Sequence, residues 1–137
     1  MILWNKEQNK DGNLSYVAET FDHKPSIQEI KEVIEEYINN QVKEEIYSGL
    51  VVDNNTVWLS LENQINYQST YNLACQTEGK NLPQTFKFGE DYYKTFNTLD
   101  ELQEFYLMVR NHIDSCISKG WQAKSKIDYS KYEKLLT

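Results

Sequence analysis

The strongest hydrophobic pattern in the 137-residue chain runs from Thr98 to Lys119. At about 100° per residue, its apolar side chains fall in one sector of a helical wheel and its polar side chains fall opposite. The apolar sector holds Leu102, Phe105, Tyr106, Val109, Ile113, Cys116 and Ile117. Thr98 followed by Glu101 matches a capping box, which marks the start of a helix. The pattern predicts a long helix that forms the spine of a small domain.

A second helix is predicted over residues 26–47, where Ser26 and Glu29 form another capping box. Its apolar positions sweep about 220° of the wheel, more than twice the stripe of a helix that packs on one core. These positions are Ile27, Ile30, Val33, Ile34, Tyr37, Ile38, Val42 and Ile46. Either the helix crosses its own domain obliquely, or the side that holds the last three of these residues binds a second chain.

Two β-hairpins are predicted, each from two apolar runs that flank a cluster of turn-forming residues. Their strands cover residues 50–52 with 56–59, and residues 85–88 with 92–96. The first turn is Asp53-Asn54-Asn55, whose residue types tolerate positive φ, and the second is Gly89-Glu90-Asp91. A further pair of short strands is expected within residues 1–19.

A middle helix is predicted from Leu61 to Thr77, with Ser60 as its N-cap. Its expected buried face is unusually polar, so that the two glutamines on it would need hydrogen-bond partners or a place at the edge of the interface. This face holds Leu61, Gln64, Ile65, Tyr67, Gln68, Tyr71, Ala74 and Cys75. Cys75 and Cys116 each fall on the apolar side of a predicted helix, which favours reduced core thiols over a disulfide or a metal site.

Together these elements predict an α+β fold in which two β-hairpins alternate with three main helices and the long C-terminal helix is the spine. The spine is expected to continue past Gly120, with a weak point at the glycine, before a short amphipathic segment at residues 129–136. We expect residues 1–48 to form an N-terminal arm and bridging helix, and residues 49–137 to form the α+β domain.

The charge of the chain is negative but unevenly distributed. Fourteen basic and twenty-one acidic residues give a net charge of −7, which argues against nonspecific nucleic-acid binding. Residues 117–137 nevertheless carry five lysines against two acidic residues, which suits either the end of a helix or docking on an acidic partner. No window approaches the roughly 20 apolar residues of a membrane span, and the first residues lack the pattern of a signal peptide. Composition therefore favours a protein that stays in the cytoplasm.

Groups that could support catalysis are sparse. His23 and His112 have no metal-binding or triad partner at a recognisable spacing. Asp100, Glu101 and Glu104 are explained by the preference of a helix N-terminus for acidic residues. The sequence also lacks the spacing of an EF-hand and a glycine-rich phosphate loop. We therefore expect no enzymatic activity, no cofactor and no metal.

Four stretches resemble an uncharacterised family of short phage and prophage proteins, often encoded beside tail-fibre genes. They are Val57-Trp58-Leu59-Ser60, Glu62-Asn63-Gln64-Ile65-Asn66-Tyr67, Leu82-Pro83-Gln84-Thr85-Phe86-Lys87 and Phe96-Asn97-Thr98-Leu99-Asp100-Glu101-Leu102. The resemblance covers about residues 49–128, although many members carry Trp at the position of Phe86. The order of elements is distinctive, but no motif is chemically diagnostic.

This resemblance implies a non-enzymatic role in the tail, as a virion component or as a tail-fibre assembly factor that acts through protein–protein contacts. The expected partners are phage tail or fibre proteins or another copy of the chain, in the host cytoplasm during assembly or in the virion. The alternative is a phage-encoded inhibitor that binds a host protein, because a small acidic fold can occupy a basic channel.

One strip of the spine helix is predicted to bind a partner. Leu107 points nearly opposite to the apolar sector, and Arg110, Asp114 and Trp121 fall near the same side. Trp and Arg dominate binding hot spots, whereas a solvated face has little use for tryptophan. The alternative is that residues 129–136 fold back over Trp121 and cover it within one chain.

Overall fold

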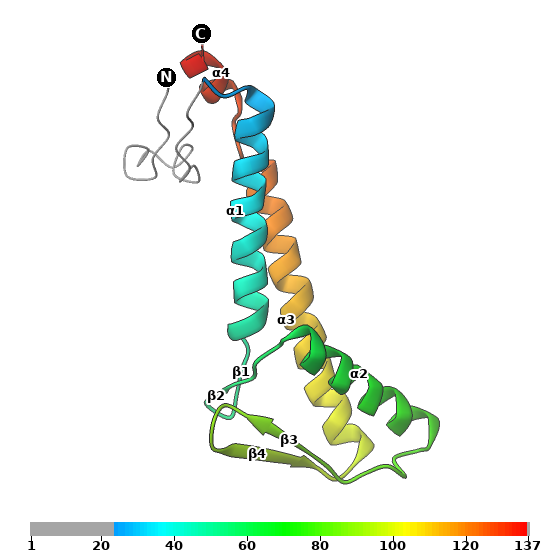
Figure 1. The fold of residues 1–137 in the computed structure, drawn as a ribbon. Helices are drawn as coiled ribbons and strands as arrows, with labels where there is room; N and C mark the ends of the chain where they lie inside the picture. Colours follow the sequence, from blue (N-terminus) through cyan, green and yellow to red (C-terminus); the bar gives the residue numbers. More distant parts are fainter. Residues whose placement is uncertain (1–23, 137) are drawn as a thin grey trace. The chain divides into compact units, whose positions relative to one another are not determined.

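The structure is a computed structural model in which residues 24–136 are described, so the two strands expected within residues 1–19 lie outside it. The elements in chain order are α1 (Ile27–Ser48), β1 (Val51–Val52), β2 (Asn55–Thr56), α2 (Leu61–Gln76), β3 (Gln84–Phe88), β4 (Tyr92–Phe96), α3 (Leu99–Ser125) and α4 (Ser130–Leu136) (Figure 1). The predicted α+β fold, with two small antiparallel hairpins and a long C-terminal helix, is confirmed.

The chain divides into two compact units. The central unit is Lys43–Ile117, and the described part of the terminal unit is residues 24–42 and 118–136. The long helices α1 and α3 each contribute residues to both units. The domain boundary predicted between residues 48 and 49 stays a prediction.

In the central unit, both predicted hairpins form. Asp53 and Asn54 have φ values of 53° and 63°, as the two central residues of a type I′ turn require. The strands β1 and β2 are shorter than predicted and end at Thr56, but the Val57 N–H still donates to the Leu50 carbonyl at 2.8 Å. The second hairpin pairs Phe88 with Tyr92 around the predicted three-residue tip.

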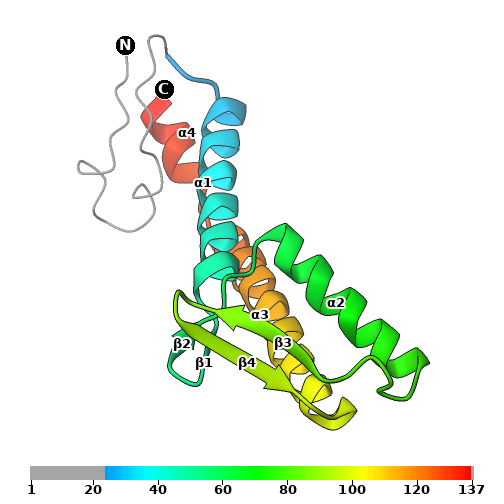
Figure 2. The ribbon, with the colours of Figure 1, turned by 60° about the horizontal axis from the view of Figure 1, so that its bottom comes forward.

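The first half of α3 carries the core of the central unit, with α2 and the β3–β4 hairpin packed along it (Figure 2). The Thr98 hydroxyl accepts the Glu101 N–H at 3.2 Å, as the capping box requires. The Glu101 carboxylate reaches back to the Asn97 N–H at 3.0 Å, one residue earlier than predicted. Phe105 is 3% exposed, and its ring contacts four aromatic rings. These are the rings of Tyr67, Phe86, Phe88 and Phe96.

The predicted buried face of α2 is wrong in part. The Ser60 cap is confirmed, because its hydroxyl accepts the Asn63 N–H at 3.1 Å. Of the predicted face, only Tyr67 and Ala74 are fully buried. The exposed members are Leu61, Ile65, Gln68 and Cys75. The helix turns Tyr67 toward α3 because its ring packs edge-on against Phe86 and Phe105, with ring centroids 4.8 and 5.1 Å apart.

The terminal unit has its own core. The capping box of α1 forms in both directions, since the Glu29 N–H donates to the Ser26 hydroxyl and the Ser26 N–H donates to the Glu29 carboxylate, each at 3.1 Å. Its buried residues are Ile30, Ile34, Ile38 and Tyr132. The predicted weak point at Gly120 is instead a site of close packing, because α3 continues through it and a Cβ there would lie 2.6 Å from Cγ2 of Val42.

Candidate functional site

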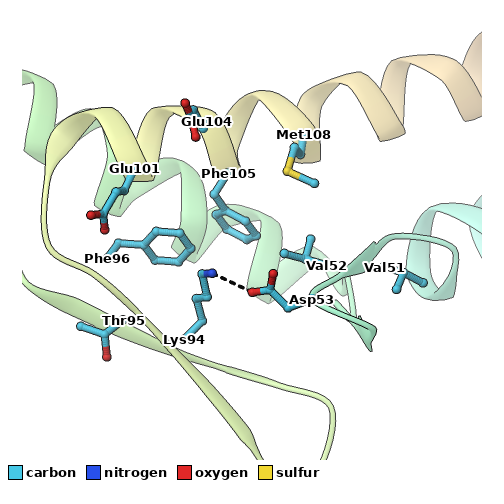
Figure 3. A pocket seen from close by; sticks show the side chains of 10 residues that line it. All are labelled: Val51, Val52, Asp53, Lys94, Thr95, Phe96, Glu101, Glu104, Phe105 and Met108. Atoms are coloured by element: carbon cyan, nitrogen blue, oxygen red, sulfur yellow. Dashed lines mark hydrogen bonds and ion pairs between the residues drawn. The ribbon is translucent and has the colours of Figure 1, made fainter.

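The central unit has a pocket of about 490 Å³ between the β1–β2 turn, β4 and the first half of α3 (Figure 3). We call it the carboxylate pocket. It is lined by Val51, Val52, Asp53, Lys94, Thr95, Phe96, Glu101, Glu104, Phe105 and Met108. Apolar side chains form part of its wall, and three carboxyl groups and one lysine surround them. A pocket of this kind can hold a ligand that is both apolar and positively charged.

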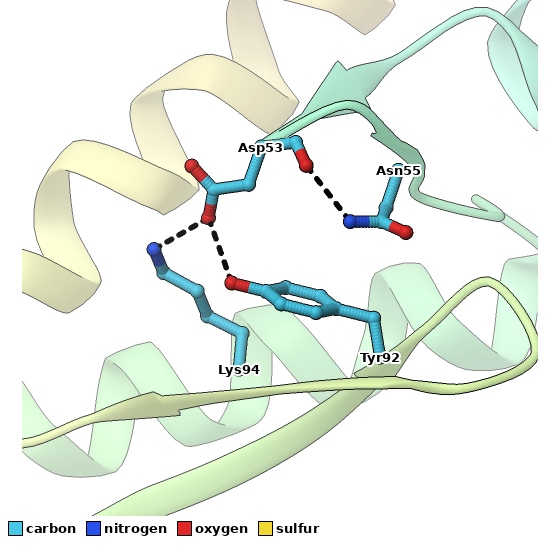
Figure 4. Close-up of polar contacts among 4 residues, drawn as sticks. All are labelled: Asp53, Asn55, Tyr92 and Lys94. Carbon is cyan, nitrogen blue, oxygen red and sulfur yellow. Dashed lines mark hydrogen bonds and ion pairs between the residues drawn. The ribbon is translucent and has the colours of Figure 1, made fainter.

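An ion pair joins the two hairpins at the wall of this pocket (Figure 4). Lys94 Nζ lies 2.6 Å from Asp53 Oδ2, which also accepts the Tyr92 hydroxyl at 3.2 Å. The Asn55 amide donates to the Asp53 carbonyl at 2.8 Å and so braces the turn. The hydrogen bond from Lys94 holds the pKa of Asp53 below its usual value, and the same bond raises the pKa of Lys94. The lysine charge is therefore compensated within the pocket.

Glu101 and Glu104 contribute the other two carboxyl groups. Glu101 is occupied as part of the helix cap, through the Asn97 N–H. Glu104 is exposed on the next turn of α3. The sequence explained both residues by the helix dipole, but the structure also brings them to the pocket that Asp53 and Lys94 line.

A second hollow, of about 90 Å³, lies between α2 and α3 in the central unit. We call it the apolar groove. It is lined by Leu61, Gln64, Ile65, Gln68, Tyr106, Val109, Arg110 and Ile113. Leu61 is 72% exposed and Ile65 is 54% exposed, so two large aliphatic side chains stand in solvent at its edge. Sequence reasoning missed both because it assigned them to the buried face of α2.

The predicted partner-binding strip is exposed. Leu107 is 51% exposed, and Arg110 pairs with Asp114 at 2.9 Å. Arg110 also lines the apolar groove, so the part of the strip in the central unit, Leu107, Arg110 and Asp114, adjoins the groove at Arg110. Trp121 belongs to the terminal unit and is 68% exposed, so residues 129–136 do not cover it.

The other three predicted partner-binding residues contact the chain itself. Ile38 is 2% exposed in the core of the terminal unit, and Val42 packs against that core beside Gly120. Ile46 packs against the core of the central unit. The broad apolar sweep of α1 therefore matches its contacts with two cores, and binding of a second chain at Val42 and Ile46, which are only partly buried, stays a prediction.

His112 and the cysteines have structural surroundings. His112 Nε2 lies 2.8 Å from the Glu45 carbonyl oxygen and 3.7 Å from Cys116 Sγ. Both cysteines are free, as predicted, but Cys75 is exposed and only Cys116 is buried. Within residues 24–136, no group of three or more His, Cys, Asp or Glu side chains could hold a metal ion. His23 lies outside the described residues.

Among residues 24–136, no helix combines the length and the apolar character needed to cross a membrane. No curated protein and no solved structure matches the chain. Residues 29–135 match the family described as Domain of unknown function (DUF4376), so the match begins within α1 and includes most of that helix. Since this match spans most of the sequence, the chain belongs to the DUF4376 family.

Proposed function

We propose that the protein is a non-enzymatic, tail-associated protein of a phage or prophage, either a virion component or an assembly factor for tail fibres. It acts through protein–protein contacts made in the host cytoplasm during assembly or in the virion. The phage setting rests on the four stretches that resemble short phage and prophage proteins. The observation that supports contact with another protein is the exposed aliphatic surface around the apolar groove, at Leu61, Ile65 and Leu107.

Single exposed leucines are ordinary on protein surfaces. Here, however, two aliphatic side chains flank one groove, and Leu107 stands one turn before Arg110 of the same groove. Covering a large aliphatic side chain contributes about 1.5 to 3 kcal/mol, so burying the exposed half of each contributes about 1 kcal/mol. Arg110 and Tyr106 add the residue types that carry binding energy at interfaces. This surface therefore suits a partner with an apolar ridge.

The proposed association with the phage tail is tested by mass spectrometry of purified virions and of tail intermediates from a lysogen that encodes the protein. The proposal expects the protein in one of these fractions or in a complex with a fibre protein. If affinity purification from induced cells recovers only a host protein, the alternative of a phage-encoded inhibitor replaces the tail role.

The surface is tested with two matched variants. Leu107→Glu adds a charge on the predicted strip, one turn before Arg110, which lines the groove. Leu73→Glu adds the same charge at a leucine of α2 that is 47% exposed and does not line the groove. Both should keep the free energy of unfolding within about 0.5 kcal/mol. Only Leu107→Glu should weaken binding to the purified partner, by about tenfold or more, because it places a charge in a desolvated contact. Equal affinity for both variants would show that the strip around Leu107 is not the binding surface.

A further inference from the structure

The carboxylate pocket borders a free strand edge. Successive side chains of a strand point to opposite faces of the sheet. The pocket is lined by Lys94 and Phe96, which share one face of β4, and also by Thr95 between them, so it reaches the edge of the strand as well as that face. Among the described residues, β4 pairs only with β3, which leaves its other edge unpaired. Backbone N–H and C=O groups on such an edge can pair with another chain.

The charges of the pocket favour a cation. Its lining holds three carboxyl groups and one lysine, which gives a net charge of −2 with all four groups ionised. Since Lys94 is paired with Asp53 at 2.6 Å, the net negative charge comes from Glu101, which also caps α3, and from the exposed Glu104. Phosphate or nucleic acid would meet repulsion from these carboxylates, whereas a lysine or arginine would be attracted.

The apolar lining favours a ligand that also carries carbon side chains. Val51 is 55% exposed and Met108 is 43% exposed, and both stand at the pocket (Figure 3). Methionine adapts its shape to different partners, which suits a surface that receives a side chain. A small polyamine would leave these two side chains largely uncovered.

We propose that the carboxylate pocket binds an extended basic segment of a partner protein, which adds as a strand alongside the free edge of β4. A lysine or arginine of this segment lies at Glu101 and Glu104, and a neighbouring apolar side chain covers Val51 and Met108. Strand addition supplies backbone hydrogen bonds, and the pocket supplies selection of side chains. This site lies on the opposite flank of α3 from Arg110 and the apolar groove, so it does not depend on the proposed function.

The probe is a fluorescein-labelled peptide about as long as β4 in which lysine alternates with valine, and binding is followed by fluorescence anisotropy with the full-length protein. Control peptides replace each lysine with glutamate or methylate the backbone nitrogens. The lysine peptide should bind, and raising the salt concentration well above about 0.1 M should weaken it. The glutamate peptide should not bind, and backbone methylation should weaken binding about tenfold or more because it removes the strand hydrogen bonds.

Glu104→Lys tests the pocket without touching the helix cap that Glu101 forms. Its control is Glu44→Lys, an equal charge change at an exposed position of α1 in the central unit that does not line the pocket. Glu104→Lys should weaken the lysine peptide about tenfold, whereas Glu44→Lys should change its affinity less than about twofold. Hydrogen exchange gives an independent measurement, since the bound peptide should slow exchange of β4 amides.

Equal losses in both variants would show that only the overall charge of the protein matters and would overturn the proposal. Unchanged exchange in β4, or equal binding by the backbone-methylated peptide, would overturn the strand addition. If spermidine at a matched concentration of positive charge displaces the lysine peptide completely, the ligand is a small amine and the proposed peptide ligand is wrong.

Discussion

Replacing Gly120 with alanine sets two effects against each other. In an exposed helix the substitution stabilises by about 1 kcal/mol, because glycine loses more backbone freedom than alanine on folding. At this position, however, a Cβ would lie 2.6 Å from Cγ2 of Val42 and 4.0 Å from Cγ2 of Ile38. Valine is branched at Cβ and has few rotamers to adopt, so it cannot turn its methyl group away at little cost.

Overpacking of this kind costs about 1 to 3 kcal/mol. After subtraction of the gain in helix propensity from this cost, Gly120→Ala should destabilise the terminal unit by about 1 kcal/mol. Urea titrations monitored by circular dichroism measure this change in the free energy of unfolding. The midpoints of the two proteins are compared on the condition that the free energy of unfolding has the same dependence on urea concentration in both.

A double-mutant cycle isolates the contact. Val42→Ala removes the methyl groups that the new Cβ would meet, so in that background Gly120→Ala should stabilise by up to about 1 kcal/mol. The coupling free energy between the two substitutions should therefore be roughly 2 kcal/mol. If Gly120→Ala stabilises the protein when Val42 is intact, the close packing of α1 against α3 at this position is wrong.

Two other substitutions test the central unit. Phe105→Ala should lower the free energy of unfolding by about 3 to 5 kcal/mol in denaturant titrations, because it leaves a cavity among four aromatic rings, and Phe105→Leu should cost clearly less. Asp53→Asn should destabilise slightly at neutral pH and less at a pH below 3.8. The reason is that a carboxyl whose folded pKa is lowered stabilises the fold above its usual pKa of 3.8 and loses this contribution as the pH falls through the folded pKa. Equal effects of Asp53→Asn at both pH values in thermal melts would show that its link to Lys94 does not stabilise the fold.

Sequence reasoning succeeded where the signal is local. The capping residues at Ser26, Ser60 and Thr98 act on N–H groups three residues away, so the start of each helix can be found from a few neighbouring letters. The turn at Asp53 and Asn54 is local in the same way, because only a few residue types accept two consecutive positive φ values.

The buried face of α2 was predicted wrongly in part because the apolar residues of that helix do not form one stripe. Leu61 and Ile65 look like core residues, yet Tyr67 is the side chain that fits among the rings of Phe86 and Phe105. The side of α2 that faces the core is decided by aromatic residues far away in the sequence, so the periodicity of α2 alone does not predict it.

The carboxylate pocket was not found from sequence for a related reason. Asp53 and Lys94 are 41 residues apart, and neither lies in a motif. The signals present were the side chains of Tyr92, Lys94 and Phe96 on one face of a predicted strand and the acidic first turns of the spine helix. Without the placement of the first hairpin beside the second, these signals do not indicate a pocket.

The predicted partner-binding residues differ in the free energy needed to expose each side chain to a partner. Ile38 is 2% exposed, so contact with another chain would require it to leave its own core, which costs about 2 to 5 kcal/mol by analogy with truncation of a buried isoleucine. Leu107 is already 51% exposed and loses no packing within its own chain when a partner covers it. We therefore predict that a partner binds at Leu107 and the apolar groove in preference to Ile38.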